Sequence, residues 1–169
     1  MKLFIQLSFL LLLASQNCFG QDTISIINAS WTNLKTQLLR RADIVSNLTG
    51  LLSKSSKIDK EQLNNSKVFA VDLFKYVDTL NKKDSLSVSL ASVKNNKLTQ
   101  ALARTIVTLE NDSKLRSSND VNGLLMQLEG CENRMALAKR AYNETCKKFK
   151  RTDLLFGPDQ RVKAPEVKF

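Results

Sequence analysis

The feature that most constrains this chain is an apolar seam that runs through residues 121–149 with strict helical spacing. Its members follow one another at alternating steps of three and four residues: Val121, Leu124, Leu128, Cys131, Met135, Ala138, Tyr142, Thr145 and Phe149. Such spacing keeps one face of an α-helix apolar along its whole length. The seam predicts a long amphipathic helix that begins at Asn119 or Asp120, where a side chain can cap it, and ends near Arg151.

Three earlier stretches have the same periodicity, and they predict helices over residues 24–53, 59–80 and 88–110. Asp59 provides a cap for the second of them. Residues 85–92 alternate with a period of two, which is typical of a strand. A single strand would have no pairing partner here, so we interpret this stretch as a loop that leads into the third helix.

Four amphipathic helices joined by short connections predict an all-α fold, specifically an antiparallel up-and-down four-helix bundle with long first and last helices. The chain has 169 residues, which fits one domain. It contains only 5 Gly and 2 Pro, too few for the many turns of a β-sandwich or barrel.

Composition also limits the chemistry that the chain can perform. It contains no histidine, which excludes a Ser-His-Asp triad, a Cys-His nucleophile pair and a His-ligated zinc site. No phosphate-binding loop, nucleophile elbow or cluster of metal ligands is present. We therefore expect no catalytic residues, no cofactor and no metal, and a protein that is not an enzyme.

The first 20 residues have the three-part pattern of a secretory signal peptide. Lys2 forms a short basic region, an apolar run follows, and small residues at Cys18 and Gly20 favour cleavage before Gln21. Two alternatives remain open, an uncleaved N-terminal anchor and a lipid attached to Cys18. All three place the rest of the chain across the inner membrane, in the periplasm or at the membrane of the cell envelope.

The predicted organisation is thus a signal peptide or anchor over residues 1–20, a helical bundle over residues 21–153 and a flexible tail over residues 154–169. An exported chain could carry a disulfide. Cys131 and Cys146 are 15 residues apart in one predicted helix, which separates them by about 22 Å along its axis. A disulfide needs Cα atoms within about 7 Å, so we expect two free, buried thiols.

The sequence resembles the LemA family in three places. Residues 128–144 read Leu-Glu-Gly-Cys-Glu-Asn-Arg-Met-Ala-Leu-Ala-Lys-Arg-Ala-Tyr-Asn-Glu, which is close to the family's L-E-G-T-E-N-R-I-A-x-A-R-x-x-Y-N. Residues 37–48 resemble Q-x-x-R-R-x-D-L-I-P-N-L, and the third match lies in residues 155–157 and 164–169. Two departures stand out: Ser46 replaces the family's proline, and Asp112-Ser113 replaces the usual Tyr-Pro.

This resemblance implies a four-helix bundle in or beside the bacterial envelope. The family has no agreed catalytic activity, and its members often occur beside envelope proteins and membrane metallopeptidases. It therefore implies a non-enzymatic binding or scaffold role with an envelope protein as partner.

Arg41 occupies a slot in the otherwise apolar seam of the first helix, where an unpaired charge is costly. We predict that carboxylates of the last helix pair with it, in a polar layer that fixes helix register. The members of this layer are Arg41, Glu129, Glu132, Asn133 and Arg134. The alternative is that the Arg41 head group reaches the surface along its aliphatic stem.

A second set of residues lies away from that seam. Arg40, Asp43 and Asn47 share one side of the first helix, and a core role does not explain them. We interpret them as a candidate partner surface, with an ordinary solvated face as the alternative.

The basic charge is concentrated near the end of the chain. The whole chain carries a formal net charge of +10, and residues 134–169 contain ten Lys or Arg against four Asp or Glu. The basic end of the last helix comprises Lys147, Lys148, Lys150 and Arg151. An exported protein rarely meets nucleic acid, so the second functional hypothesis is binding to anionic lipid or another polyanion.

Overall fold

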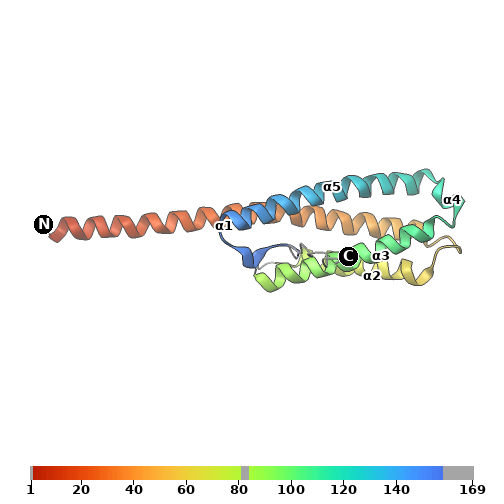
Figure 1. Ribbon diagram of the computed structural model, residues 1–169, viewed down its shortest axis with the longest axis horizontal. Coiled ribbons are helices and arrows are strands. Elements are labelled where there is room, and N and C mark those ends of the chain that lie inside the picture. Colours follow the sequence, from red (N-terminus) through yellow and green to blue (C-terminus); the bar gives the residue numbers. More distant parts are fainter. Residues whose placement is uncertain (1, 81–83, 158–169) are drawn as a thin grey trace, which may run out of the picture.

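A computed structural model describes residues 2–80 and 84–157, with side chains from residue 23 onward. The chain is all-helical, and no strand occurs among these residues. Five α-helices and one 3₁₀ turn follow one another: α1 (Lys2–Leu52), α2 (Lys60–Asp78), α3 (Ser85–Leu109), α4 (Ser113–Arg116), α5 (Asn119–Lys148) and η1 (Thr152–Leu154). The predicted all-α class is thereby confirmed (Figure 1).

Several helix boundaries differ from the prediction. The first helix begins at Lys2 rather than Ile24, so its backbone continues through the predicted signal segment. Cleavage before Gln21 stays a prediction. The third helix begins at Ser85, because the Asp84 side chain accepts a hydrogen bond from the Ser87 amide and caps it there. The alternating residues 85–92 are therefore helical from the start.

Asp59 caps α2 as predicted, accepting from the amides of Glu61 and Gln62 at 2.9 and 3.1 Å. Asp112 performs the same task for the short helix α4, accepting from Lys114 and Leu115. The same carboxylate also accepts from the Ser55 hydroxyl, which ties the loop after α1 to the start of α4. These caps satisfy amides that have no partner inside their own helix.

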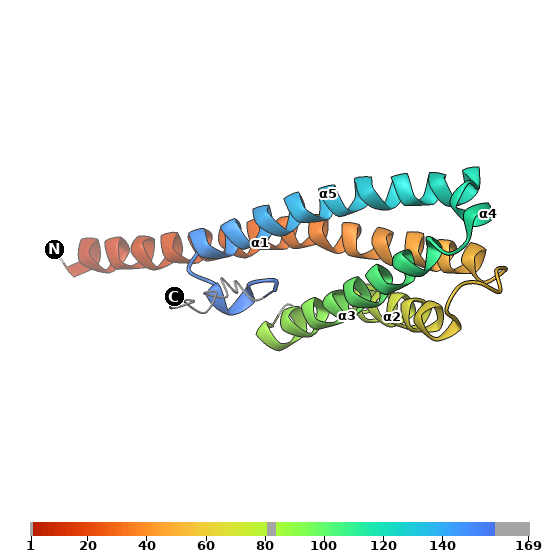
Figure 2. The same ribbon diagram turned by 45° about the vertical axis from the view of Figure 1, so that its right-hand side comes forward.

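α1 is the central element of the fold. It packs along α5 on one side and along α2 on the other, and α2 packs in turn along α3. Direct contact between α1 and α3 is slight. Figure 2 shows that α3 and α5 approach each other at α4 and diverge away from it. The two helices therefore leave a seam between them.

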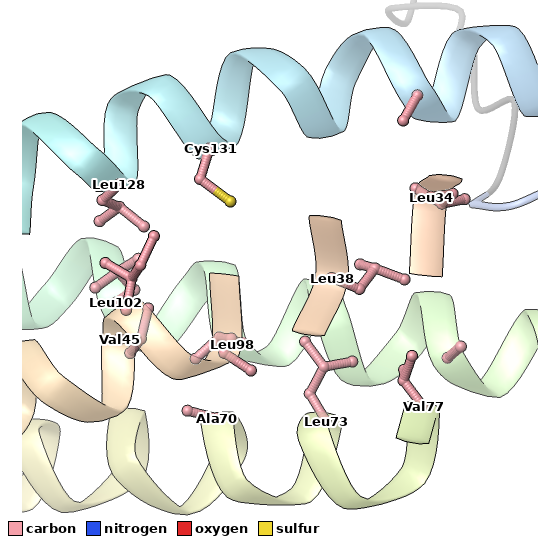
Figure 3. Close-up of a cluster of buried hydrophobic side chains, with 14 of the residues drawn as sticks. Leu34, Leu38, Val45, Ala70, Leu73, Val77, Leu98, Leu102, Leu128 and Cys131 are labelled. Carbon is pink, nitrogen blue, oxygen red and sulfur yellow. The ribbon is translucent and has the colours of Figure 1, made fainter. Parts of the chain in front are cut away.

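One apolar core joins the four long helices, and Figure 3 shows its central part. The predicted seam of α5 points into it, with Val121, Leu128, Cys131, Ala138 and Tyr142 all buried. Cys131 and Cys146 are both buried and free, which confirms the prediction for the two thiols. Over the described residues, no helix combines the length and apolarity needed to cross a membrane.

The predicted start of the flexible tail at residue 154 is wrong. Leu154 and Phe156 are buried, because the chain turns back after α5 and inserts apolar side chains between α3 and α5. The Asn143 side chain holds this segment through both backbone groups of Phe156, at 2.8 and 3.1 Å. Trp31 and Tyr142 pack against each other with ring centroids 5.4 Å apart, and the Phe156 ring lies 6.3 Å from that of Trp31. Residues 158–169 of the predicted tail lie outside the described residues.

Candidate functional site

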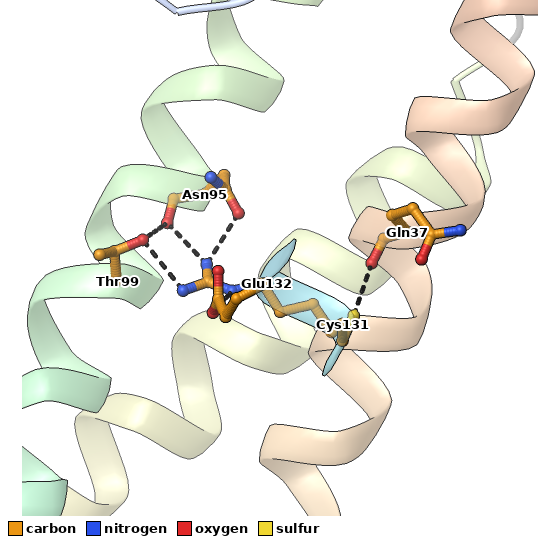
Figure 4. A network of polar contacts seen from close by, with 6 residues as sticks. Gln37, Asn95, Thr99, Cys131 and Glu132 are labelled. Carbon is orange, nitrogen blue, oxygen red and sulfur yellow. Dashed lines mark hydrogen bonds and ion pairs between the residues drawn. The ribbon is translucent and has the colours of Figure 1, made fainter. Parts of the chain in front are cut away.

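A buried arginine lies at the centre of the molecule. Arg41 projects from α1 and retains only 1 % of its surface exposed. Its Nε donates to Oε1 of Glu132 on α5 at 2.6 Å. Figure 4 shows Glu132 facing Asn95 and Thr99 of α3. Burying an unpaired guanidinium would be costly, and the half-exposed Glu132 carboxylate supplies the compensating charge. The prediction that Arg41 is buried and paired with the last long helix holds, and its head group does not reach the surface.

The other side of the guanidinium faces α3. Its Nη1 donates to Oδ1 of Asn95 at 2.8 Å and to the Asn95 carbonyl oxygen at 3.3 Å. Its Nη2 donates to the Thr99 hydroxyl at 3.0 Å, and that hydroxyl donates to the Asn95 carbonyl at 3.0 Å. One rigid planar group thus fixes α1, α3 and α5 relative to one another. Because α3 packs mainly along α2 and has little other contact with α1, these bonds are its main direct link to α1 and α5.

Three predicted members of the polar layer lie elsewhere. Glu129, Asn133 and Arg134 are exposed, and their inclusion in a buried layer is wrong. The inward face of α5 carries Leu128, Cys131 and Ala138, and helix geometry turns these three polar residues away from it. Arg134 instead folds back along its own helix over Gly130.

Asn95 and Thr99 complete the layer, and neither is among the residues predicted for it. Asn95 occupies a core position of α3, between Ala91 and Leu98, and is 7 % exposed. A polar residue within that apolar frame, followed by a hydroxyl one turn later, is the signal that the sequence offers. Arg41 and Asn95 are polar residues at core positions of the predicted helices 24–53 and 88–110. Pairing these two positions would predict their contact from the sequence.

Beside the polar layer, the seam between α3 and α5 opens into a groove of about 340 Å³. Its residues come from both helices, with Arg41 and Glu132 at one end: Arg41, Thr99, Leu102, Ala103, Ile106, Leu125, Leu128, Glu129 and Glu132. We call this the α3–α5 groove. Its wall is mainly aliphatic, and its acidic rim is formed by the exposed Glu129 and the half-exposed Glu132. This combination suits an apolar segment that carries basic side chains.

A second hollow, of about 510 Å³, lies farther along the same side of α3. It is lined by residues of α3 and by the segment that follows α5: Ser85, Ser89, Ser92, Val93, Asn96, Thr152, Asp153, Leu155 and Gly157. The two hollows share one helical face, because the steps from Ser85 through Ser89, Ser92, Asn96, Thr99 and Ala103 to Ile106 alternate between four and three. The segment after α5 therefore occupies part of the seam beside the second hollow, and the α3–α5 groove lies beyond it toward α4.

The candidate partner surface on α1 is exposed. Arg40, Asp43 and Asn47 lie on the narrow strip of α1 that neither α2 nor α5 covers. Among the described residues, none of their side chains makes a hydrogen bond or ion pair. They form a polar ridge rather than a pocket.

The basic end of α5 divides into two parts. Lys147, Lys148 and Lys150 are exposed, and Arg151 forms two 2.9 Å bonds with Asp153. This end of α5 lies beside α1, where the hydroxyls of Ser30 and Thr145 are 3.2 Å apart. Over the described residues, no group of three or more potential metal ligands occurs.

These observations define an all-helical protein with a buried arginine layer and an open seam between α3 and α5. The chain belongs to the LemA family, whose model matches residues 30–169. No curated protein matches it. The family match covers every residue of the Arg41 layer and the α3–α5 groove.

Proposed function

We propose that this chain is a non-enzymatic scaffold protein of the cell envelope that holds a protein partner in the α3–α5 groove. The groove itself carries the proposal. Its floor is formed by the buried Leu102 and Leu128, and the partly exposed Ile106 and Leu125 line it beside the carboxylates of Glu129 and Glu132. Exposed apolar concavities of this kind are typical of peptide- and helix-binding sites.

The polar layer explains why such a groove would persist without a partner. In this proposal α1, α2, α3 and α5 form an antiparallel four-helix bundle that is closed along three seams and open along the fourth. Arg41 holds α3 and α5 at a fixed spacing through Asn95, Thr99 and Glu132. A preformed site loses less conformational entropy on binding than one that must open first.

Export supports a partner within the envelope. The signal-like segment over residues 1–20 and the family assignment are the basis of this part of the proposal. Mass spectrometry of the mature N-terminus distinguishes the three alternatives for residues 1–20. A chain beginning at Gln21 indicates a released protein, an intact Met1 indicates an anchor, and a lipid on Cys18 indicates a lipoprotein.

A pair of groove variants tests the proposal. Ala103 is exposed within the groove, whereas its neighbour Arg104 lies on the outer side of α3. Ala103→Trp fills the groove, and Arg104→Trp adds the same bulk outside it. We expect a partner cross-linked to wild-type protein in native envelopes to be lost with Ala103→Trp and retained with Arg104→Trp. Equal recovery with both variants would contradict binding in the groove.

The ridge on α1 offers a competing location for the same function. A variant with Asp43→Ala and Asn47→Ala removes two of its polar side chains without touching the core. Loss of the partner in this variant, with retention in Ala103→Trp, would move the site from the groove to α1.

A second candidate function rests on the region where the C-terminal end of α5 lies beside α1. Exposed Ile24 and Ile26 on α1 lie near the end of α5 that carries Lys147, Lys148 and Lys150. Apolar and basic side chains together suit an anionic lipid surface. In this alternative, the protein floats with vesicles that contain anionic lipid at low salt and dissociates at high salt. Absent or salt-insensitive binding would exclude it.

A further inference from the structure

The second hollow is lined by polar side chains from one face of α3. Ser85, Ser89, Ser92 and Asn96 follow one another at steps of four, three and four residues, which places them on a single side of the helix. A helix face that packs against another segment is typically apolar. This face instead gathers hydroxyl and carboxamide groups over the first turns of a 25-residue helix.

The segment after α5 forms the opposite wall of the hollow, beside the start of α3 (Figure 2). It contributes four lining residues: Thr152, Asp153, Leu155 and Gly157. The side chain of Asn143 holds this wall through the backbone of Phe156. The hollow of about 510 Å³ is therefore preformed, and it falls within the range of about 300–1,000 Å³ that is typical of small-molecule sites.

Ser92 is the residue that indicates a ligand. It is only 3 % exposed, and its Oγ faces the opposite wall, 3.4 Å from where a β-carbon on Gly157 would lie. Among the described residues, the Ser92 hydroxyl has no hydrogen-bond partner. A buried hydroxyl without a partner is costly, and most such groups in native proteins are paired. A bound molecule with hydroxyl groups of its own would supply the partner.

The other polar side chains of the lining are also available for binding. Over the part of the chain that the structure describes, no hydrogen bond is made by the side chains of Ser85, Ser89, Asn96 or Thr152. A hydroxyl both donates and accepts hydrogen bonds, and so does a carboxamide. Such a set suits a ligand whose groups also do both, as the hydroxyl groups of a sugar do.

The charges around the hollow favour a neutral ligand. Among the described residues that line it, only Asp153 is charged, and both of its carboxylate oxygens accept from Arg151 at 2.9 Å. Lys139 lies against Gly157 but outside the lining. The aliphatic side chains of Val93 and Leu155 add an apolar surface against which the C–H face of a sugar ring can pack.

We propose that the second hollow binds a neutral saccharide, with Ser92 and Asn96 bonding its hydroxyl groups and Val93 and Leu155 packing against its ring. The sugar replaces water molecules that solvate these side chains, and its ring holds the replacing hydroxyl groups at fixed positions. The hollow shares no lining residue with the α3–α5 groove. Saccharide binding is therefore tested with different variants from those that test the partner site.

Titration of the full-length chain with neutral oligosaccharides tests the proposal. The probes are chitotriose, maltotriose and cellotriose, and the readout is the NMR shift of backbone amides in α3. We expect at least one probe to shift the amides of Ser89, Ser92 and Asn96, with a Kd on the order of 1 mM or lower. Asn96→Ala should weaken this binding about three- to tenfold. Gln100→Ala removes an exposed carboxamide one turn away, outside the lining, and should leave the affinity unchanged.

Ser92→Ala distinguishes a binding role of this hydroxyl from a structural one. The substitution removes a buried polar group that has no partner and introduces a better helix former, so the melting temperature should not fall. Affinity for the saccharide should nevertheless decrease about three- to tenfold. A lower melting temperature with unchanged affinity would show that the hydroxyl serves the fold and does not bind a ligand.

Three other outcomes overturn the inference. If none of the three probes shifts these amides, the hollow is not a saccharide site. Equal affinity in the wild type, Asn96→Ala and Ser92→Ala would place the sugar elsewhere on the molecule. Binding of glucuronate without binding of any neutral probe would assign the hollow to an anion beside Lys139.

Discussion

Nε of Arg41 and Oε1 of Glu132 are 2.6 Å apart, and they join two helices at positions separated by 91 residues in the sequence. The guanidinium is nearly inaccessible to solvent, whereas the Glu132 side chain keeps 36 % of its surface exposed. The pair therefore runs from the core of the molecule to the edge of the α3–α5 groove. Removing the cation leaves Asn95 and Thr99 without their shared donor, and so changes α3 as well as α5.

Arg41→Ala should lower the free energy of unfolding by about 2–5 kcal/mol, because it leaves a cavity at a fully buried position and removes the hydrogen bonds to Asn95, Thr99 and Glu132. For a chain of this size, that corresponds to a fall in Tm of roughly 10 °C. Arg40→Ala is the matched control, since Arg40 is exposed and adjacent. Its effect should stay within about 0.5 kcal/mol. A shift below about one degree for Arg41→Ala, measured by thermal melting, would contradict a buried charge layer.

Gly157→Ala should destabilise the protein by about 1–2 kcal/mol, because alanine is strained at a φ of +82°. Gly123→Ala is the counterpart in α5, where nothing lies within 4 Å of an added β-carbon. That substitution should stabilise by about 0.5–1 kcal/mol through helix propensity. Urea unfolding of the two variants checks the opposite signs, and a shared sign would contradict the left-handed backbone at Gly157.

Lys150→Gly should raise the free energy of unfolding by about 1 kcal/mol, because the left-handed backbone at this position favours glycine. Lys150 has a φ of 57°, and the amides of Lys150 and Arg151 bond the carbonyls of Lys147 and Cys146 at 3.0 and 2.8 Å. This is the Schellman arrangement that ends a helix. Lys148→Gly removes the same charge within α5 and should instead destabilise by about 1 kcal/mol. The two melting temperatures should therefore move in opposite directions.

Stability should fall at alkaline pH. Burial raises the pKa of the Cys131 and Cys146 thiols above their ordinary 9.0, and burial also raises the pKa of the Tyr142 hydroxyl above its ordinary 10.0. Below these ordinary values, all three groups are protonated in both states and their contribution is complete. As the pH rises past about 9, the unfolded chain releases protons that the folded chain retains, so the unfolding free energy decreases.

Urea titrations between about pH 7 and pH 10.5 measure this decrease. Tyr142→Phe removes one of the three groups while keeping the ring that packs on Trp31. Its stability should therefore fall less steeply than that of the wild type above about pH 9.5. An identical slope in the variant would show that the Tyr142 hydroxyl does not contribute.

Much of this fold could be predicted from periodicity. The seam of α5 is correct because burial selects one face of a helix, and residues such as Leu128, Ala138 and Tyr142 mark that face directly. The burial of Arg41 could be predicted because a charge in an apolar seam is conspicuous. The helical class required nothing beyond these local signals, whereas the family resemblance rests on the motifs in residues 37–48 and 128–144.

The partners of Arg41 were harder to predict, because they depend on which helices are neighbours and on their register. Glu129 and Glu132 each directly follow a residue of the apolar seam of α5. Only the packing of α1 on α5 determines which of the two carboxylates pairs with Arg41. Asn95 lies on a helix that barely touches α1 except through the guanidinium itself. The buried segment after α5 escapes prediction for a related reason: Leu154 and Phe156 have no periodicity, and their burial depends on the divergence of α3 from α5.

A photo-crosslinking residue at position 103 in the living cell gives the sharpest test of a partner site on this protein. A crosslinker in place of Ala103 should capture a discrete envelope protein, and the same crosslinker in place of Arg104, one residue away on the outer side of α3, should not. Capture of the same protein in equal yield from both positions, or from position 104 alone, would contradict a partner site in the α3–α5 groove.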